Sequence, residues 1–364
     1  MEEPSPDHPP VAVAPAGFLR LPAAALRACL REGFTAASLR SEVLAGAVVG
    51  IVALPLAMAL AIASGVPPQH GLYTAIVGGF VISALGGSRV LVSGPTAAFV
   101  VVLAPIAERF GLGGLLIATL MAGLLLVIMG LAGMGRFVEF VPYPVTTGFT
   151  SGIALVIATL QVKDLLGLQV GSMPEHYLDK LGALARALPS LNPADTAVGL
   201  LALLVLLFWP RLDKRVPAPL VALLAGALAG LALAQVGPGW QVATLGSRFS
   251  YELGGQRFGG IPPLPPLPLL PWNLPGPDGQ PVGVSLELLR HLAPPAFAIA
   301  MLGAIESLLA AVVADGMTHQ RHDPDAELLA QGVGNVVAPF FGGIAATGAI
   351  ARTATNVRAG GRTP

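Results

Sequence analysis

Two ionisable side chains stand inside long apolar runs of the sequence. Glu306 interrupts the run from 291 to 314, and Arg352 directly follows the charge-free run from 328 to 351. A charge at the centre of a bilayer costs at least about 2.5–3.5 kcal/mol, so each side chain should face a partner or a wet cavity. The arginine could hold an anion, whereas the glutamate could pair with Arg352, hold a coupling cation or carry a proton. A bridge between the two charges that is only structural is the alternative.

Two short breaks in the apolar stretches carry the signals of a helix start. Residues 93–96 read Ser-Gly-Pro-Thr and residues 346–349 read Ala-Thr-Gly-Ala. A proline just inside a helix start is typical of an N-terminus, and each half-helix would direct unpaired N–H groups and about half a positive charge toward the membrane centre. Two such ends predict an anion site, unless Pro95 only kinks an ordinary span. The predicted anion-site residues are Gly94, Pro95, Thr96, Ala97, Ala349, Ile350, Ala351 and Arg352.

Three further polar residues have simpler expected roles. Gln331 and Asn335 could line a cavity or form hydrogen bonds between helices. His70, two residues after a break at Pro67-Pro68, is expected in a loop or at the membrane interface.

The composition excludes several classes of protein. Of 364 residues, 54% are hydrophobic and 11% charged, whereas a soluble domain carries about 25% charged residues. The 20 basic residues balance 20 acidic ones, which leaves no basic face for nucleic acid. The sequence contains no P-loop, zinc motif or Ser/His/Asp constellation, so we expect no enzyme, no cofactor beyond a coupling ion, and no metal site.

The apolar runs predict an all-α polytopic membrane protein of about ten segments. Residues 43–88 carry no charge and are broken at 67–70 into two spans of about 20 residues. Two short strands, near 90 and near 350, should enter the membrane and lead into the half-helices. The other runs are 90–107, 110–135, 140–162, 196–210, 216–247, 291–314 and 328–351.

Basic residues at the span ends predict the orientation. With the N-terminus inside, twelve of the 20 Lys and Arg residues lie inside, seven lie outside, and Arg352 is left at membrane depth. Because basic residues concentrate in cytoplasmic loops, we expect a cytosolic N-terminus and a multi-pass protein of the cytoplasmic (inner) membrane.

The chain is predicted to divide into four parts. Residues 1–41 form a cytosolic tail, in which 18–34 could be a short amphipathic helix or a solvated arm. Residues 42–236 form a first repeat of seven segments, 237–289 a Pro- and Gly-rich extended connector on the outside, and 290–364 the start of a second repeat (segments 8–10).

An internal similarity supports this division. Residues of the second span recur 256 positions later, and seven spans, an odd number, separate the two copies, so the second copy should be inverted in the membrane. The recurring residues are Leu72, Val77, Gly78, Val81, Gly86 and Gly87, matched by Leu328, Val333, Gly334, Val337, Gly342 and Gly343.

These motifs, in this order, resemble the SulP family of sulfate permeases and anion exchangers, which includes bacterial dicarboxylate and bicarbonate transporters. The resemblance runs from about residue 41 to the last residue. The stretches that carry it are 54–59 (LPLAMA), 66–73 (VPPQHGLY), 92–96 (VSGPT), 140–149 (FVPYPVTTGF), 303–309 (GAIESLL), 313–317 (VADGM) and 353–363 (TATNVRAGGRT).

The resemblance implies a fold of 14 segments in two inverted sevens, with a core and a gate domain and usually a cytosolic STAS domain. On that pattern the chain ends in the tenth segment, so segments 11–14 and any STAS domain would be missing. We expect a homodimer in the lipid bilayer.

The resemblance also assigns roles to single residues. Thr96 and Arg352 match anion-site positions, and Glu306 matches an acid that binds a cation or a proton in relatives, with Gly303 in the same motif. Pro55 and Leu56 match a substrate-contacting pair, although many members have a polar residue in place of Leu56. Ala310 replaces the hydroxyl of sodium-coupled bicarbonate relatives, which favours H⁺ over Na⁺.

We therefore expect a secondary active transporter of small anions, H⁺-coupled and working by an elevator step. Sulfate is the family's default substrate, and bicarbonate and C4-dicarboxylates are the alternatives. The alternative from a different class of protein is an uncoupled anion channel, or a non-transporting membrane scaffold that acts through a cytosolic partner. A nucleobase permease of the same fold would carry a second acid where this chain has Arg352.

Overall fold

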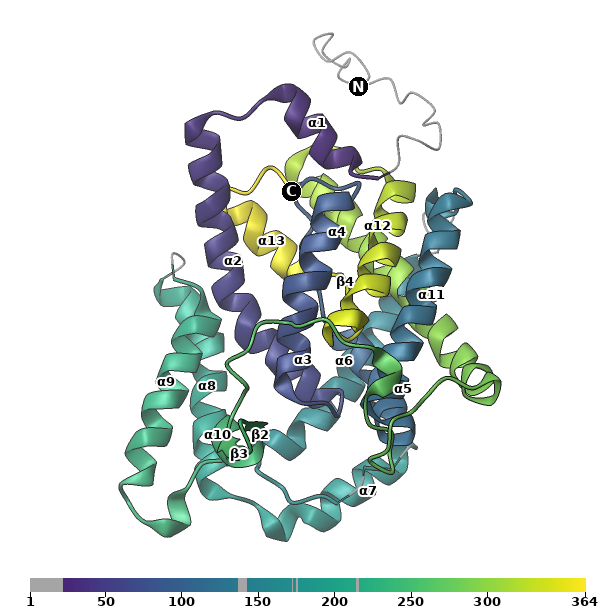
Figure 1. Cartoon of the computed structure of the whole chain (residues 1–364). Coiled ribbons are helices and arrows are strands. Elements are labelled where there is room, and N and C mark those ends of the chain that lie inside the picture. Colours follow the sequence, from purple (N-terminus) through teal and green to yellow (C-terminus); the bar gives the residue numbers. More distant parts are fainter. Residues whose placement is uncertain (1–21, 137–142, 172, 175, 214–215) are drawn as a thin grey trace.

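The computed structural model describes residues 22–136, 143–171, 173–174, 176–213 and 216–364, and this part of the chain is mostly helical (Figure 1). The first residues of the motif at 140–149 lie outside it. The helices are α1 (Ala24–Glu32), α2 (Ala36–Ala63), α3 (Pro68–Tyr73), α4 (Gly79–Leu85), α5 (Ala97–Leu131), α6 (Tyr143–Leu165), α7 (Tyr177–Ala187), α8 (Pro193–Leu212), α9 (Ala218–Ala234), α10 (Leu245–Arg248), α11 (Leu286–Thr318), α12 (Pro324–Val337) and α13 (Ile350–Ala359). The strands are β1 (Ser93–Gly94), β2 (Ser250–Leu253), β3 (Gln256–Gly259) and β4 (Thr347–Gly348).

The helix bounds follow the apolar runs and their breaks. Among the described residues, α2, α5, α8 and α11 are long and apolar enough to cross a membrane. The break at 67–70 separates α2 from α3, which continues through a π-helical turn, η2 (Thr74–Gly78), into α4. Helix α5 joins two predicted runs across a kink at Gly111, whose φ of 68° lies in the region that glycine adopts without cost.

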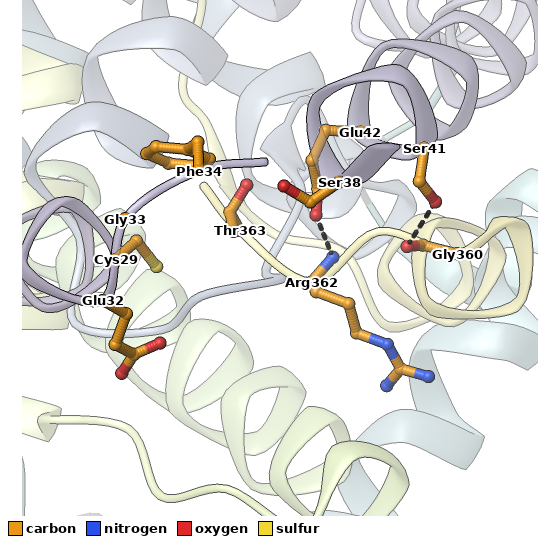
Figure 2. Close-up of a pocket in the computed structure, with 10 residues that line it drawn as sticks. All are labelled: Cys29, Glu32, Gly33, Phe34, Ser38, Ser41, Glu42, Gly360, Arg362 and Thr363. Atoms are coloured by element: carbon orange, nitrogen blue, oxygen red, sulfur yellow. Dashed lines mark hydrogen bonds between the residues drawn. The ribbon is translucent and has the colours of Figure 1, made fainter. Parts of the chain in front are cut away.

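Both ends of the described chain are tied to neighbouring helices. Helix α1 lies within the predicted 18–34 segment, but it is no free arm, since Arg89 beyond α4 forms an ion pair with Glu32 at its end. This bond lowers the pKa of the Glu32 carboxyl. After α13, the Arg362 amide donates to Glu42 Oε1 (2.9 Å) and the Ser41 hydroxyl to the Gly360 carbonyl (3.2 Å), beside a cavity of about 440 Å³ (Figure 2).

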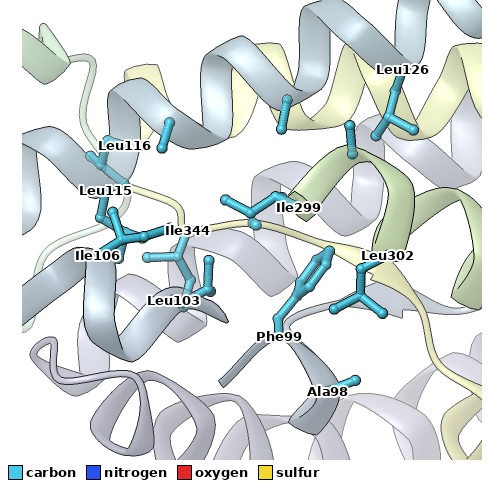
Figure 3. Packing of buried hydrophobic residues seen from close by; sticks show 14 of the residues in the cluster. Ala98, Phe99, Leu103, Ile106, Leu115, Leu116, Leu126, Ile299, Leu302 and Ile344 are labelled. Carbon is cyan, nitrogen blue, oxygen red and sulfur yellow. The ribbon is translucent and has the colours of Figure 1, made fainter. Parts of the chain in front are cut away.

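The hydrophobic core lies between α5 and α11 and extends to the segment before β4. Figure 3 shows Phe99, Leu103 and Ile106 of α5 close to Ile299 of α11 and to Ile344. These side chains are at most 4% exposed. The core therefore includes residues next to both places where the sequence breaks its helices.

Helix α12 packs on α5 backbone to backbone. A Cβ atom on Gly332 would lie 2.5 Å from the amide nitrogen of Val127, and one on Gly123 would lie 2.7 Å from the carbonyl carbon of Asn335. Real Cβ atoms do not approach backbone so closely, so glycine is required on both sides of this contact.

The two copies of the internal similarity lie against each other and run in opposite directions. Gly87, after α4, lies against Asp323 at the start of α12, and Gly334 farther along α12 lies against Ile82 and the Gly78 carbonyl. Gly343, beyond α12, lies against Thr74 near the start of the first copy.

The predicted connector is only partly extended. Besides the hairpin of strands β2 and β3 it contains the short helix α10, and α11 already begins at Leu286 rather than at 290. The later part binds the helical core, because the Leu269 amide donates to the Phe340 carbonyl (2.7 Å) and the Gly113 amide donates to the Pro275 carbonyl (3.2 Å).

The prediction that His70 lies in a loop was wrong, and its alternative position at the membrane interface stays a prediction. The residue belongs to α3 and is 7% exposed, and its Nδ1 lies 2.6 Å from the Gly342 carbonyl oxygen. The adjacent break positions the imidazole where it joins the two copies of the repeat.

The close approach of α5 and α12 predicts that a larger residue at the contact lowers stability. Gly332→Ala should lower the free energy of unfolding by about 1–3 kcal/mol, because the added methyl overpacks a backbone contact. The matched control is Gly316→Ala in α11, where a Cβ would meet nothing within 4 Å. This substitution should leave the free energy of unfolding unchanged or raise it by up to about 1 kcal/mol. Thermal unfolding in detergent measures both, and equal melting temperatures would contradict the assigned packing.

Candidate functional site

Strands β1 and β4 bring together two helix starts that lie far apart in the sequence. They pair antiparallel, with Ser93 opposite Gly348 and Gly94 opposite Thr347. The Ala349 amide donates to the Val92 carbonyl (2.9 Å), and the Val92 amide donates to Thr353 Oγ1 (3.0 Å). The predicted strands leading into α5 and α13 are thus present.

Both helix starts keep backbone N–H groups available. Thr96 is the N-cap residue of α5 and Ala349 that of α13, and neither side chain caps its helix. The first-turn N–H groups of a helix have no partner within the helix, and each such end carries about half a positive charge. Around them, Gly94 and Pro95 are buried, Ala97 and Ala349 are half-buried, and Ile350 and Ala351 are exposed.

Arg352 lies across the paired strands and is 3% exposed. Its Nη2 donates to the Pro95 carbonyl, and a Cβ on Gly94 would lie 2.5 Å from its Nη1. Its Nε is buried and has no hydrogen-bond partner in the described part of the chain. The guanidinium is therefore positioned by a neutral carbonyl and retains an unused donor.

Glu306 faces the same site from α11 and bonds to a hydroxyl. Its Oε2 accepts from Thr96 Oγ1 at 2.9 Å. No ion pair within 4.0 Å joins Glu306 to Arg352 among the described residues. The predicted Glu–Arg bridge is therefore wrong, and the two other expected roles, binding a cation or carrying a proton, are left.

Of the other candidates from the sequence, Gly303 is bonded to a strand of the site, whereas Pro55 and Leu56 are not bonded to its polar residues. The Gly303 carbonyl accepts from Thr347 Oγ1 (3.0 Å), which fixes β4 on α11. Helix α2, with Pro55 and Leu56, packs beside α13, but no hydrogen bond joins either residue to Thr96 or Arg352, and the Leu56 side chain is 39% exposed.

A buried polar network behind the site includes a residue that the sequence analysis missed. Glu327 is 1% exposed and accepts from the amides of Gly87 (3.1 Å) and Ser88 (3.2 Å). Gln331 Nε2 donates to Glu327 Oε1 and to Ser93 Oγ, both at 3.0 Å. Glu327 directly precedes the run 328–351 and so resembled the end of a polar loop. The sequence feature that could have identified Glu327 is the enrichment of acidic residues in the first turn of a helix.

Gln331 and Asn335 were expected to line a cavity or to form hydrogen bonds between helices, and their bonds instead join α12 to the two strand segments. Asn335 Nδ2 donates to the Ala346 carbonyl, and its Oδ1 accepts from the Ala346 amide, both at 2.8 Å. Together with Gln331 on Ser93, it attaches α12 to both strands.

The cavity in Figure 2 is separate from this constellation. It is lined by residues of α1, the start of α2 and the segment after α13, among them Cys29, Glu42 and Arg362. None of the predicted anion-site residues lines it.

Known proteins with similar sequences are membrane transporters. A Bacillus subtilis (strain 168) protein, YvdB, which carries a provisional name as a sulfate transporter, is 39% identical over 333 residues, covering 92% of this chain and 58% of its own. The "Bicarbonate transporter BicA" of Picosynechococcus sp. is 32% identical over 336 residues, covering 90% of this chain and 55% of its own. The chain thus spans a little over half the length of these relatives.

Solved structures show the same fold. The transmembrane domain of a cyanobacterial bicarbonate transporter BicA superposes with a TM-score of 0.75 at 30% identity, covering 91% of this chain and 79% of that one. Murine Solute Carrier 26 family member A9, an anion transporter in the inward-facing state, gives 0.73 at 18% identity over 98% of this chain and 59% of that one, which shows the fold alone.

The family profile described as the Sulfate permease family matches residues 39–364. On that match, this multi-pass membrane protein belongs to the sulfate permease family, a family of transporters and not of enzymes.

Proposed function

We propose that this protein is a secondary active transporter of small anions and that the anion binds between the starts of α5 and α13. The observation that carries the proposal is the buried Arg352 guanidinium, for which the described residues provide no partner at Nε and no carboxylate within ion-pair distance. A buried charge without a counter-charge is costly, and an anion would supply that counter-charge while accepting from the helix N–H groups.

The class of anion follows from the relatives. Their names include sulfate and bicarbonate, so we propose sulfate first and bicarbonate second, with C4-dicarboxylates as the alternative that the sequence resemblance adds. A guanidinium with an unused donor and two helix ends suits any of these oxyanions.

The coupling ion is proposed to be H⁺, taken up at Glu306. A carboxylate that bonds a neutral hydroxyl can change its charge without breaking an ion pair. Ala310 offers no hydroxyl to Na⁺, and the Gly303 carbonyl already accepts from Thr347. If the protein were an uncoupled channel, Glu306 would not need to take up a proton during transport.

The proposed transport step is an elevator movement of a core against a gate. The packing of α2–α5 with α11–α13 supports the core, since α8 and α9 pack chiefly on each other and stand to one side (Figure 1). The opposite directions of the 68–85 segment and α12 support inverted repeats, with the divisions 42–236, 237–289 and 290–364. We place the N-terminus in the cytosol and the protein, as a homodimer, in the inner membrane.

Replacing the guanidinium tests the proposal directly. Arg352→Ala should abolish uptake of labelled sulfate or bicarbonate into liposomes, because the proposed counter-charge is gone. Arg358→Ala, an exposed arginine in the last turn of the same helix, should leave uptake unchanged. Unchanged uptake by Arg352→Ala would refute the site.

A competition panel identifies the anion and the coupling ion. Sulfate, bicarbonate, fumarate, succinate and chloride are tested at acidic and alkaline pH, with and without Na⁺. Uptake against the anion gradient that is driven by an inward proton gradient is the expected result. Uptake that only follows the anion gradient would indicate a channel.

Gly94 offers a finer test of the position of the guanidinium. In Gly94→Ala the new methyl would meet Nη1, the end of a flexible side chain, and the φ of 157° at this position is one that L side chains rarely adopt. We therefore expect the guanidinium to move together with a local strain in β1, and thermal unfolding checks that the variant is folded. Anion affinity should fall about tenfold or more, since a charged hydrogen bond contributes about 1.5–3 kcal/mol. Gly46→Ala on α2, where a Cβ would meet nothing within 4 Å, is the control, and equal affinities of the two variants would contradict the assigned contact.

A further inference from the structure

The hydrogen bond between Thr96 and Glu306 joins the proposed anion site to the proposed proton acceptor. A threonine at an N-cap position ordinarily accepts from an N–H group of its own helix. Thr96 instead donates its hydroxyl to Glu306 Oε2 at 2.9 Å and leaves the start of α5 uncapped. The side chain therefore faces α11 and the anion site at once.

The direction of this bond depends on the charge of Glu306. An ionised carboxylate only accepts hydrogen bonds, whereas a protonated one has an O–H donor. With Glu306 ionised, the single proton of Thr96 is committed to Oε2, and the Thr96 oxygen can present only lone pairs elsewhere. With Glu306 protonated, its O–H can donate to Thr96 Oγ1, and the Thr96 proton becomes available to another acceptor.

In the part of the chain that the structure describes, the other polar groups of the elements packed on α11 form their hydrogen bonds with groups other than Glu306. From α13, Arg352 is the charged side chain that faces it, and this guanidinium is engaged by the Pro95 carbonyl. From β4, the Thr347 hydroxyl is committed to the Gly303 carbonyl. From α12, Glu327 is bonded to two backbone amides and to Gln331. In the described part of the chain, Thr96 is thus the hydrogen-bond partner of Glu306.

We propose that Thr96 is the residue that couples the two ions: a proton bound at Glu306 Oε2 reverses the Thr96–Glu306 hydrogen bond and turns the Thr96 O–H toward the anion. This inference rests on the proposed anion transport. A hydronium ion loses one O–H bond and becomes water, one O–H bond forms at Glu306 Oε2, the Thr96 hydroxyl rotates about its Cβ–Oγ1 bond, and no other covalent bond changes. The ionised state presents a negative charge and lone pairs to an anion, whereas the protonated state presents a donor, so proton and anion bind together.

The test compares anion affinity at two pH values in proteoliposomes. Labelled sulfate is the first probe, because its charge is constant between mildly acidic and alkaline pH, and labelled bicarbonate at matched anion concentration is the second. Thr96→Val keeps the shape of the side chain and removes the hydroxyl. It should weaken apparent affinity about tenfold at acidic pH and leave it unchanged at alkaline pH. Thr96→Ser should restore the wild-type pH dependence.

Two further variants complete the design. In Glu306→Gln the amide can donate permanently to Thr96 Oγ1, so affinity should be independent of pH, and adding Thr96→Val should weaken it about tenfold at both pH values. Thr119→Val is the matched control on α5, since that hydroxyl bonds only its own helix, at the Leu115 carbonyl (2.9 Å), and its pH profile should equal that of the wild type. Thermal unfolding confirms that each variant is folded.

The outcomes separate this inference from the proposed function. Wild-type protein that takes up neither probe, or whose affinity does not change with pH, overturns proton-coupled transport itself. Suppose instead that the affinity of the wild-type protein depends on pH. If Thr96→Val then loses the same amount of anion affinity at both pH values, or loses none at either, only the role of Thr96 is overturned.

Discussion

Backbone N–H and C=O groups at membrane depth must be bonded within the protein, and the pairing of β1 with β4 meets that constraint for the two interruptions of the helices. Non-helical backbone is tolerated at this depth only where protein or a wet cavity surrounds it. Each strand is two residues long, and each supplies the partners that the other lacks. The starts of α5 and α13 meet because neither interruption could be buried alone.

The surrounding helices are arranged to hold this pair. Gln331 and Asn335 attach α12 to the strand regions by side-chain bonds, and Thr347 attaches β4 to α11. Helix α12 can reach both strands because glycines let it approach α5 at backbone distance. Glycine at these positions thus lets a helix that carries polar side chains come close to the rest of the core.

The sequence predicted those parts of the site that depend on local chemistry. Pro95 with its preceding glycine predicted a helix start, and the charge-free run before Arg352 predicted a buried arginine. It did not predict which groups would bond, because Thr96 and Glu306 are separated by 210 residues and their contact depends on how three elements pack. The Glu306–Arg352 bridge, one of the alternatives for Glu306, was wrong for the same reason: opposite charges at the same depth suggest a bond, but the guanidinium donates to the Pro95 carbonyl at the break. Glu327 was missed because an acid at the end of an apolar run resembles a loop residue until helix α12 is seen to begin before it.

Arg352 and Glu306 each bond to a neutral group, and this affects how easily the site could bind and release ions. If Arg352 and Glu306 were paired, each would satisfy the other, and an anion or a proton would have to displace an existing ion pair, which is strongly unfavourable in a buried setting. A carbonyl orients the guanidinium without cancelling its charge, and a hydroxyl orients the carboxylate while serving either of its protonation states. The charge of each group is then left to the proposed mobile ions. With a singly charged anion, a site loaded with both ions carries no net charge, whereas loading with either ion alone leaves one unit of charge. The low-dielectric surroundings that make buried charge costly would then also favour carrying the two together.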